Sequence, residues 1–392
     1  MEFSNKHKGT HMSTLSRSIG AFIAIFALIS TSAVHAKAYK AAEIYTKQTY
    51  HYGRYETRMK AAKGSGILST FFTYKNGSEV TGNTWEEIDL EIFGKNNATQ
   101  WQSNVIIGTT PSLVRTEGVH TAPASLGDDY HTYAIEWTPE YIAWYVDGDQ
   151  IRRITGGQFV TSLVSNQDIR FNMWPCNVTS WAGAFSDTIL PIYQFVNYIE
   201  YKPYDSITKN FVGGGFRDEF NGLDTARWGI GSYTFNDNIA DFDPANVTTK
   251  NGTLVLSLTK EGKSAYTGTP PVDTGIHLEA ENFNTAGGSV TVSGGVVGNI
   301  DAGEWLKYSN INVPVTGTYK IEYRVASAIT TAQFTLDRDG VGLGTLLVPN
   351  TGGWGTYTII SHNIYLTAGV QNLSVYANSG GFNIDYIRLK KI

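Results

Sequence analysis

Three acidic residues occupy alternate positions in the otherwise apolar stretch 85–94: Glu87, Asp89 and Glu91. Side chains of a β-strand alternate between its two faces, so these carboxylates would share one face while Ile and Leu occupy the other. Like charges in a row repel each other, and a purely structural strand would rarely keep this pattern. The spacing therefore predicts a strand that carries a functional row of acids.

The distance between the outer two acids suggests their chemistry. Four residues of strand place the Cα atoms of Glu87 and Glu91 roughly 13 Å apart. If both side chains lean toward each other, their carboxyl groups come within roughly 5–6 Å, near the spacing of retaining glycosidases and short of that of inverting ones. The alternative is an acidic edge strand exposed to solvent.

The pattern of apolar and turn residues along the surrounding chain is typical of an all-β protein. Short alternating segments between Gly, Asn and Asp turns predict strands at 53–60, 66–74, 87–93, 102–107, 131–138, 141–146, 169–173 and 193–201. The pair Asp147-Gly148 predicts a hairpin. No long segment of helical period follows residue 36, so we expect a two-sheet sandwich with little helix.

An open sheet face lined by aromatic side chains would form a glycan cleft, because aromatic rings stack on the apolar faces of sugars. Core packing is the alternative for each of these rings. The aromatic candidates are Phe72, Tyr74, Trp101, Trp174, Trp181, Tyr233 and Phe235.

Charge and composition narrow the function and the compartment. The 392 residues carry a net charge of −5 without long runs, so neither nucleic acid nor an anionic membrane is an expected partner. Basic residues before position 18, an apolar run at 19–29 and the small-residue site ending at Ala36 predict a signal peptide over residues 1–36. We expect a secreted monomer without a membrane span, and Cys176, as the single cysteine, forms no internal disulfide.

Residues 52–56 (YGRYE), 85–94 and 131–137 (HTYAIEW) resemble glycoside hydrolase family 16, whose members are β-jelly-roll endo-glycanases. The form E-x-D-x-E, together with Gln102-Ser103-Asn104 and residues 174–181, is similar to lichenases (endo-1,3-1,4-β-glucanases). Xyloglucan transglycosylases share the same E-x-D-x-E form. The resemblance implies mixed-linkage β-glucan as the substrate.

The order of segments resembles the circularly permuted bacterial lichenases. Residues 216–222 (FRDEFNG) and 246–258 follow the catalytic half, whereas the corresponding segments precede it in most lichenases. Permutation is reasonable when the old termini lie close together at the surface, and 205–215 would then be the joining stretch. The alternative is that 216–260 forms a separate small domain.

The resemblance assigns roles by residue. It implies that Glu87 is the nucleophile, that Glu91 is the general acid/base and that Asp89 orients the nucleophile between them. His131 would either hydrogen-bond into this network or be a buried structural residue. Tyr233 stands where such enzymes often carry Trp. The implied substrate-binding residues are Phe72, Tyr74, Asn76, Gln102, Asn104, Trp174, Trp181, Tyr233 and Phe235.

Residues 276–392 resemble a family 6 carbohydrate-binding module, on the segments 278–283, 301–305, 352–354 and 382–386. The expected organisation is a signal peptide at 1–36, a catalytic domain at 37–260, a linker at 261–275 and the module at 276–392. The resemblance implies that Trp305 and Trp354 sandwich a sugar ring and that Asn383 hydrogen-bonds it.

Calcium is the one implied cofactor, and no organic cofactor is expected. In the catalytic domain Asn197 would bind it with backbone oxygens near Glu219 and Gly252. In the module Glu279, Glu281 and Asp385 would bind it, because calcium prefers oxygen ligands. The expected activity is retaining hydrolysis of mixed-linkage glucan. The alternatives are a transglycosylase acting on β-glucan or xyloglucan, and a non-catalytic lectin with two glycan-binding domains.

Overall fold

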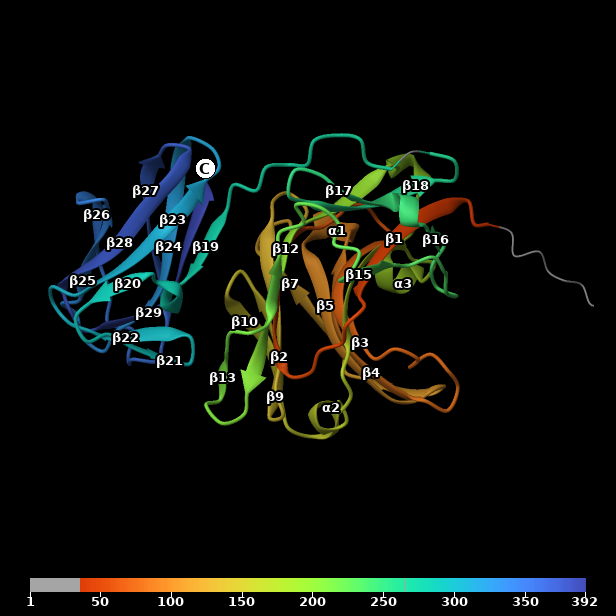
Figure 1. The fold of residues 1–392 in the computed structure, drawn as a ribbon, viewed down its shortest axis with the longest axis horizontal. Coiled ribbons are helices and arrows are strands. Elements are labelled where there is room, and N and C mark those ends of the chain that lie inside the picture. Colours follow the sequence, from red (N-terminus) through yellow and green to blue (C-terminus); the bar gives the residue numbers. More distant parts are fainter. Residues whose placement is uncertain (1–35, 264) are drawn as a thin grey trace, which may run out of the picture. The chain divides into compact units, whose positions relative to one another are not determined.

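The computed structural model describes residues 36–263 and 265–392, so the expected signal peptide falls almost wholly outside the described residues. Strands dominate, and they surround two separate hydrophobic cores, one from residues 41–258 and one from residues 280–389 (Figure 1). None of the helices in the described part of the chain has the length and apolarity needed to cross a membrane. The helices are α1 (Lys95–Ala98), α2 (Gln158–Thr161), α3 (Thr179–Ala182), η1 (Asp187–Ile189), η2 (Pro244–Asn246) and η3 (Ala280–Asn282).

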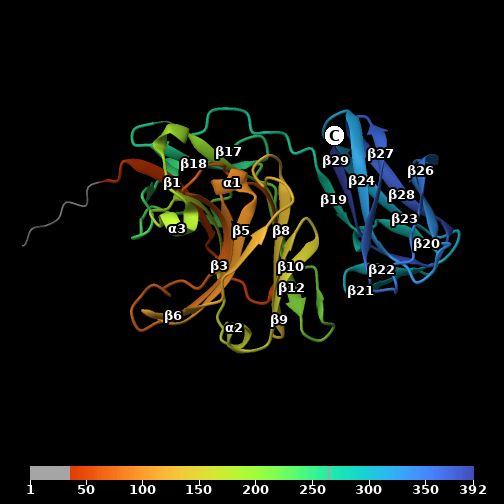
Figure 2. The same ribbon diagram turned by 180° about the vertical axis from the view of Figure 1, so that it is seen from behind.

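The first core lies between two antiparallel sheets, here called the cleft sheet and the outer sheet (Figures 1 and 2). The cleft sheet runs β15 (Trp228–Ile230), β1 (Tyr39–Thr46), β11 (Asp168–Pro175), β3 (Ile67–Tyr74), β4 (Thr84–Phe93) and β5 (Gln100–Thr109), with β6 (Ser112–Arg115) and β7 (Gly118–Thr121) on β5. The outer sheet runs β17 (Val247–Thr249), β18 (Leu254–Lys260), β12 (Ile192–Asp205), β2 (Gly53–Lys60), β8 (His131–Trp137), β9 (Tyr141–Val146) and β10 (Asp149–Thr155).

Residues 216–260 complete this sandwich rather than form a domain of their own. Strands β15, β16 (Asp241–Phe242) and β18 pair with β1, while β14 (Phe216–Asp218) and β18 pair with β12. The separate-domain alternative is therefore wrong, and the pairing fits the permuted order. The 205–215 stretch contains β13 (Asn210–Phe211), which folds back on β12.

The expected hairpin at Asp147-Gly148 is confirmed. Both residues have positive φ, 51° and 84°, and they connect the paired strands β9 and β10. Two consecutive residues of positive φ form a turn whose twist matches that of the strands, and Asp and Gly tolerate this conformation.

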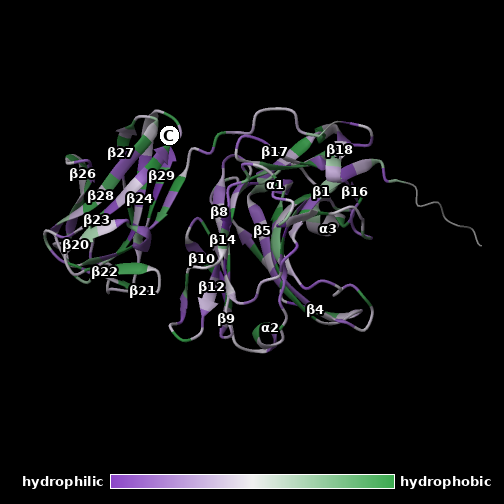
Figure 3. Ribbon diagram, viewed as in Figure 1, coloured by the Kyte–Doolittle hydropathy of each residue, from purple (hydrophilic) through white to green (hydrophobic). Residues whose placement is uncertain are grey.

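The second core lies between two further antiparallel sheets. In β24 (Gly317–Ala326) alternate residues are buried, and Figure 3 shows hydrophobic and hydrophilic stretches interleaved along the strands. One sheet runs β21 (Thr291–Ser293), β22 (Val296–Ile300), β29 (Phe382–Lys391), β24 (Gly317–Ala326) and β27 (Thr358–Leu366), with β19 (Ile276–Glu279) on β29. The other runs β20 (Thr285–Gly287), β23 (Trp305–Val313), β28 (Gly369–Ser379), β25 (Gln333–Arg338) and β26 (Val341–Leu347).

Candidate active site

The predicted row of acids lies along β4 in the middle of the cleft sheet. Ile88, Leu90 and Ile92 are fully buried in the core, so the alternate residues face outward from the sheet. The three acids Glu87, Asp89 and Glu91 all line one cavity of about 940 Å³. The structure thus confirms that the three acids share one face of the strand while the apolar residues share the other.

Neighbouring strands place polar and aromatic side chains beside each acid. Across from β4, strand β3 aligns Tyr74 with Glu87 and Phe72 with Asp89, and strand β5 aligns Asn104 with Asp89 and Gln102 with Glu91. These residues share the cleft face with the acids because directly paired residues of antiparallel strands point the same way. They line the same cavity.

Each outer acid has a distinct hydrogen-bond partner. Trp85 Nε1 donates to Glu87 Oε2 at 2.5 Å, and Gln102 Nε2 donates to Glu91 Oε2 at 3.0 Å. Trp181 Nε1 in turn donates to the side-chain oxygen Oε1 of Gln102 at 3.2 Å, which orients the side-chain amide. Sequence reasoning assigned no role to Trp85, although it occupies the same face as Glu87, two positions before it.

Burial raises the pKa of all three carboxyl groups, and repulsion by neighbouring acids adds to the rise at Asp89 and Glu91. Burial raises the pKa of Glu91 to about 8, and the charge of Glu87 adds to the rise. The pKa of Asp89 lies well above its usual value because of burial and then the charges of Glu87 and Glu91. Burial also raises the pKa of Glu87, but hydrogen bonds from Trp85 and Asp89 oppose this. The charge of Glu87 adds to the rise in the pKa of Glu91, whereas hydrogen bonds oppose the rise at Glu87. This difference favours a protonated Glu91 and a charged Glu87, the states that a general acid and a nucleophile need.

Aromatic rings form the walls of the cavity. Phe235 and Trp174 pack edge to face with ring centroids 4.8 Å apart, and the Trp174 and Trp181 ring centroids are 6.1 Å apart. Tyr233 and Phe235 remain 45% and 36% exposed, so the wall is open to solvent at this end. Such half-exposed rings can stack on sugar units.

Sequence reasoning missed a charged group at this end of the cavity. The Arg170 guanidinium donates to Asn76 at 2.7 Å and to Glu43 at 3.0 Å, and it lies 4.7 Å from the Tyr74 ring centroid. Asn172, also on β11, donates to Glu43 at 3.1 Å. Arg170 thus fixes three cavity-lining side chains. The alternation Asp168, Arg170, Asn172 and Trp174 along one predicted strand was a signal that could have found it.

The structure decides between the alternatives that the sequence left open for two residues. Trp101 is 1% exposed and packs in the core against His120, because it pairs with Ile92 on the core face of the sheet. His131 Nδ1 lies 2.7 Å from Asp147 Oδ2 on the outer sheet, so it does not join the carboxylate network and its structural interpretation holds.

In the sandwich formed by residues 276–391, Asn383 Nδ2 donates to the Trp354 backbone carbonyl oxygen at 2.8 Å. The Trp354 side chain is 47% exposed. Trp305 has other neighbours: it faces Gly287 on β20 and pairs with Tyr376 on β28. The structure therefore brings Trp354 and Asn383 together, and the sandwich of a sugar ring between Trp305 and Trp354 stays a prediction.

The calcium ligands expected in the module, Glu279, Glu281 and Asp385, fit the ion only in part. Glu281 Oε2 is buried without a hydrogen-bond partner, and burial, with the charge of Glu279, raises the pKa of Glu281 to about 7. A cation would relieve this repulsion. Asp385, however, is paired with Arg324. Within 36–263 and 265–392, no group of three or more His, Cys, Asp or Glu side chains is arranged to hold a metal ion.

The catalytic-domain calcium ligands are also only partly assembled. A Cβ atom at Gly252, whose φ is +69°, would lie 3.7 Å from the Glu219 carbonyl oxygen, so these two backbone segments are adjacent. Asn197 Nδ2 donates to Asp273 Oδ2 at 2.8 Å, which leaves the amide oxygen of Asn197 for another partner.

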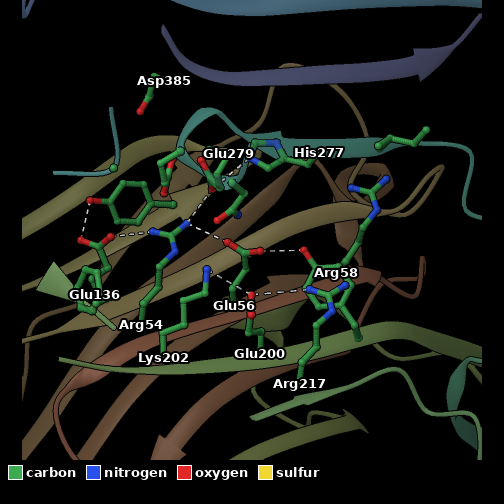
Figure 4. A pocket seen from close by; sticks show the side chains of 18 of the residues that line it. Arg54, Glu56, Arg58, Glu136, Glu200, Lys202, Arg217, His277, Glu279 and Asp385 are labelled. Carbon is green, nitrogen blue, oxygen red and sulfur yellow. Dashed lines mark hydrogen bonds and ion pairs between the residues drawn. The ribbon is translucent and has the colours of Figure 1, made fainter. Parts of the chain in front are cut away.

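A second charged cluster lies on the outer sheet, and its charges are paired with one another (Figure 4). Arg54 of β2 donates to Glu56 at 2.9 Å and to Glu136 of β8 at 2.7 Å. The hydroxyls of Tyr141 and Tyr145 also donate to Glu136, at 2.9 and 2.8 Å. Arg54, Glu56 and Glu136 are thus paired in a structural network and offer no row of free acids like that on β4.

A β-sandwich that holds a buried row of acids at the base of an aromatic cavity defines the class of glycoside hydrolases. Comparison with known proteins supports the same class. The model of "Glycosyl hydrolases family 16" matches residues 15–189, and that of "Carbohydrate binding module (family 6)" matches residues 273–391. The chain belongs to glycosyl hydrolases family 16 and carries a family 6 carbohydrate-binding module. The all-β jelly-roll expectation is confirmed.

Several bacterial relatives carry the name "Beta-glucanase". The one from Fibrobacter succinogenes is 38% identical over 257 residues, which cover 64% of this chain and 72% of the relative. The one from Brevibacillus brevis is 34% identical over 176 residues, covering 45% and 65%. The one from Acetivibrio thermocellus is 38% identical over 169 residues, covering 42% and 46%.

Proposed function

We propose that the protein is a secreted endo-β-glucanase that hydrolyses mixed-linkage β-1,3-1,4-glucan with retention of configuration. The observation that carries the proposal is the row Glu87, Asp89 and Glu91 at the base of an open cavity lined by aromatic rings. An open cavity suits an internal segment of a polysaccharide. The names of the relatives and the E-x-D-x-E spacing support β-glucan as the polymer.

The chemistry would proceed in two displacements. A carboxylate oxygen of Glu87 bonds to the anomeric carbon while the bond to the leaving sugar breaks, and Glu91 gives its proton to the departing oxygen. Glu91 then takes a proton from water, whose oxygen displaces Glu87 from the anomeric carbon. Two inversions restore the original configuration. Asp89, which hydrogen-bonds Glu87, would keep that carboxylate oriented.

A substrate panel tests this proposal. We expect release of reducing ends from lichenan, with much slower release from laminarin, xyloglucan and carboxymethyl-cellulose. Proton NMR taken before mutarotation should show the β-anomer at the new reducing end. Release of the α-anomer would contradict retention, and transfer of glycosyl units to added oligosaccharide in preference to water would favour the transglycosylase alternative.

The module is proposed to hold the enzyme on its polysaccharide, which raises the local substrate concentration. We expect Trp354→Ala to weaken retention on insoluble β-glucan by about fivefold, since a stacked aromatic ring contributes about 1 kcal/mol. Activity on soluble glucan should be unchanged. Tyr365→Ala is the matched control, because Tyr365 is also exposed (62%) but lies on β27, away from Asn383. Equal retention by both variants would rule out Trp354 as the contact.

We also propose structural calcium. Glu279 and Glu281 would hold it in the module, and Asn197 with the backbone oxygens of Glu219 and Gly252 would hold it in the catalytic domain. The ion would neutralise the buried carboxylates and tie loop ends together. Its role is structural, so no catalytic step involves it.

A further inference from the structure

The segment that carries the open end of the cleft wall is tied to Lys37, near the start of the described chain. The ammonium of Lys37 donates to Thr234 Oγ1 at 2.6 Å, to the Phe235 carbonyl at 3.3 Å and to the Asn238 carbonyl. An ammonium group has three hydrogens to donate. All three therefore have acceptors in one short segment, residues 233–240, here called the wall segment.

The wall segment presents Tyr233 and Phe235 to the cavity. Within it, Thr234 Oγ1 donates to the Ala240 carbonyl at 2.7 Å, and the Asn238 amide donates to the Phe235 carbonyl at 3.2 Å. The Phe235 and Trp174 rings then pack in a T-shaped arrangement. Backbone bonds also join the segment to residues 175–177: Asn177 N donates to the Asp237 carbonyl at 3.0 Å, and Ile239 N donates to the Pro175 carbonyl at 2.9 Å. To these attachments Lys37 adds a cation that gathers three carbonyl and hydroxyl oxygens of the segment around one point.

The backbone nitrogen of Lys37 makes a second attachment next to the wall segment. It donates to Asp241 Oδ2 at 2.8 Å, and the same oxygen accepts from Lys40 Nζ at 3.0 Å. Asp241 begins β16, which pairs with β1, and it directly follows the wall segment. Burial of Asp241 is offset by the hydrogen bonds from Lys40 and Lys37, so the pKa of Asp241 is lowered and its carboxylate is charged.

We propose that Lys37 is a positioning residue that clamps the wall segment, and that removal of the signal peptide after Ala36 completes the clamp. In that cleavage, catalysed by a signal peptidase, water adds across the Ala36–Lys37 peptide bond. Ala36 keeps the new carboxylate, and Lys37 gains a free α-ammonium group. The neutral amide donor facing Asp241 thereby becomes a cation with three hydrogens. A charged donor on a carboxylate forms the stronger hydrogen bond.

The consequence for function is that the glycan wall is more firmly held in the mature protein than in its precursor. The acids on β4 are not touched by Lys37, so the clamp acts on sugar binding rather than on bond cleavage. This kinetic part rests on the proposed function, whereas the attachment of the wall segment can be measured without any substrate.

The test uses the full chain secreted with its own signal peptide, with the new N-terminus read by mass spectrometry. Hydrogen exchange is followed at the amides of Asn238, Ala240 and Phe242, whose bonds lie in or beside the wall segment. Because a hydrogen bond to a charged group is worth about tenfold or more in an equilibrium, we expect Lys37→Met to speed this exchange by about tenfold. On β-glucan, KM should rise by about threefold to tenfold while kcat stays within twofold.

The matched control is Lys47→Met. Lys47 Nζ also donates to a backbone carbonyl, that of Thr225, at 2.7 Å, but it does not contact the wall segment. Neither exchange at the three amides nor KM should change in this variant. Unchanged exchange in Lys37→Met would overturn the clamp. Faster exchange without a change in KM would overturn only its role in glucan binding.

The contribution of the free amino group is tested by inserting Gly-Ser between Ala36 and Lys37. After cleavage behind Ala36, Lys37 then keeps its side chain, but its backbone nitrogen remains a peptide amide. Asp241→Asn removes the partner instead. We expect faster exchange at Phe242 in both variants. A mature chain that does not begin at Lys37, or wild-type exchange in both variants, would overturn the role of processing. Absence of activity on every glucan would count against the proposed function but leave the exchange result standing.

Discussion

Glu87→Gln is expected to lower kcat on β-glucan by about 10³-fold or more, a barrier increase of ~4 kcal/mol. An amide cannot form the covalent bond to the anomeric carbon. The fold should tolerate the change, because the amide oxygen can still accept from Trp85, and a buried charge next to Asp89 is removed. The melting temperature should therefore stay at or above the wild-type value. Both quantities are measured on the purified protein with lichenan as substrate.

Glu117→Gln provides the control for this substitution. Glu117 lines the same cavity but is exposed and lies outside the row on β4. It should keep kcat within a few-fold of wild type. A Glu87→Gln protein that retains more than a tenth of wild-type kcat would show that another group is the nucleophile.

Glu91 should produce the second large effect, on both pH dependence and rate. Burial and the charge of Glu87 raise the pKa of Glu91 to about 8. The general acid must be protonated, so activity should be present below about pH 8 and fall as the pH rises through that value. Glu91→Ala should remove this limb and lower kcat on lichenan by about 10³-fold, with a smaller loss on an aryl glycoside whose leaving group needs no proton.

Azide distinguishes the roles of the two glutamates. In Glu91→Ala, azide can displace Glu87 from the glycosyl-enzyme, which forms a carbon–nitrogen bond and yields a β-glycosyl azide. If Glu91 were instead the nucleophile, azide would react directly with the substrate and yield the α-azide. Product NMR on the aryl glycoside separates these outcomes, and the α-azide would reverse the assignment.

Strand alternation accounts for most of what could be predicted of the site. It placed Glu87, Asp89 and Glu91 on one face, and the structure agrees because Ile88, Leu90 and Ile92 are fully buried. The same rule, applied to β5, would have placed Trp101 in the core, since it is adjacent to the cleft residue Gln102. Applied to β11, it would have revealed Arg170. The errors came from choosing residues by type without checking their face.

Features held by loops could not be predicted in this way. Trp354 precedes β27 in a loop, and its position beside Asn383 depends on long-range packing that leaves no periodic signal. Trp305 is on a strand, but its neighbours Gly287 and Tyr376 come from two other strands. The clamp at Lys37 likewise joins residues about 200 positions apart.

The pairing of β1 with β15, β16 and β18 has a consequence for how the protein is made. These partners lie about 180 to 220 positions further along the chain. The first strand to emerge therefore has an open edge until nearly the whole jelly roll has been synthesised. Such a high contact order slows folding. Slow folding suits the secretion proposed above, because a chain crosses a translocation channel unfolded. The order of segments in this chain thus makes completion of the cavity-bearing sandwich depend on strands that are synthesised last.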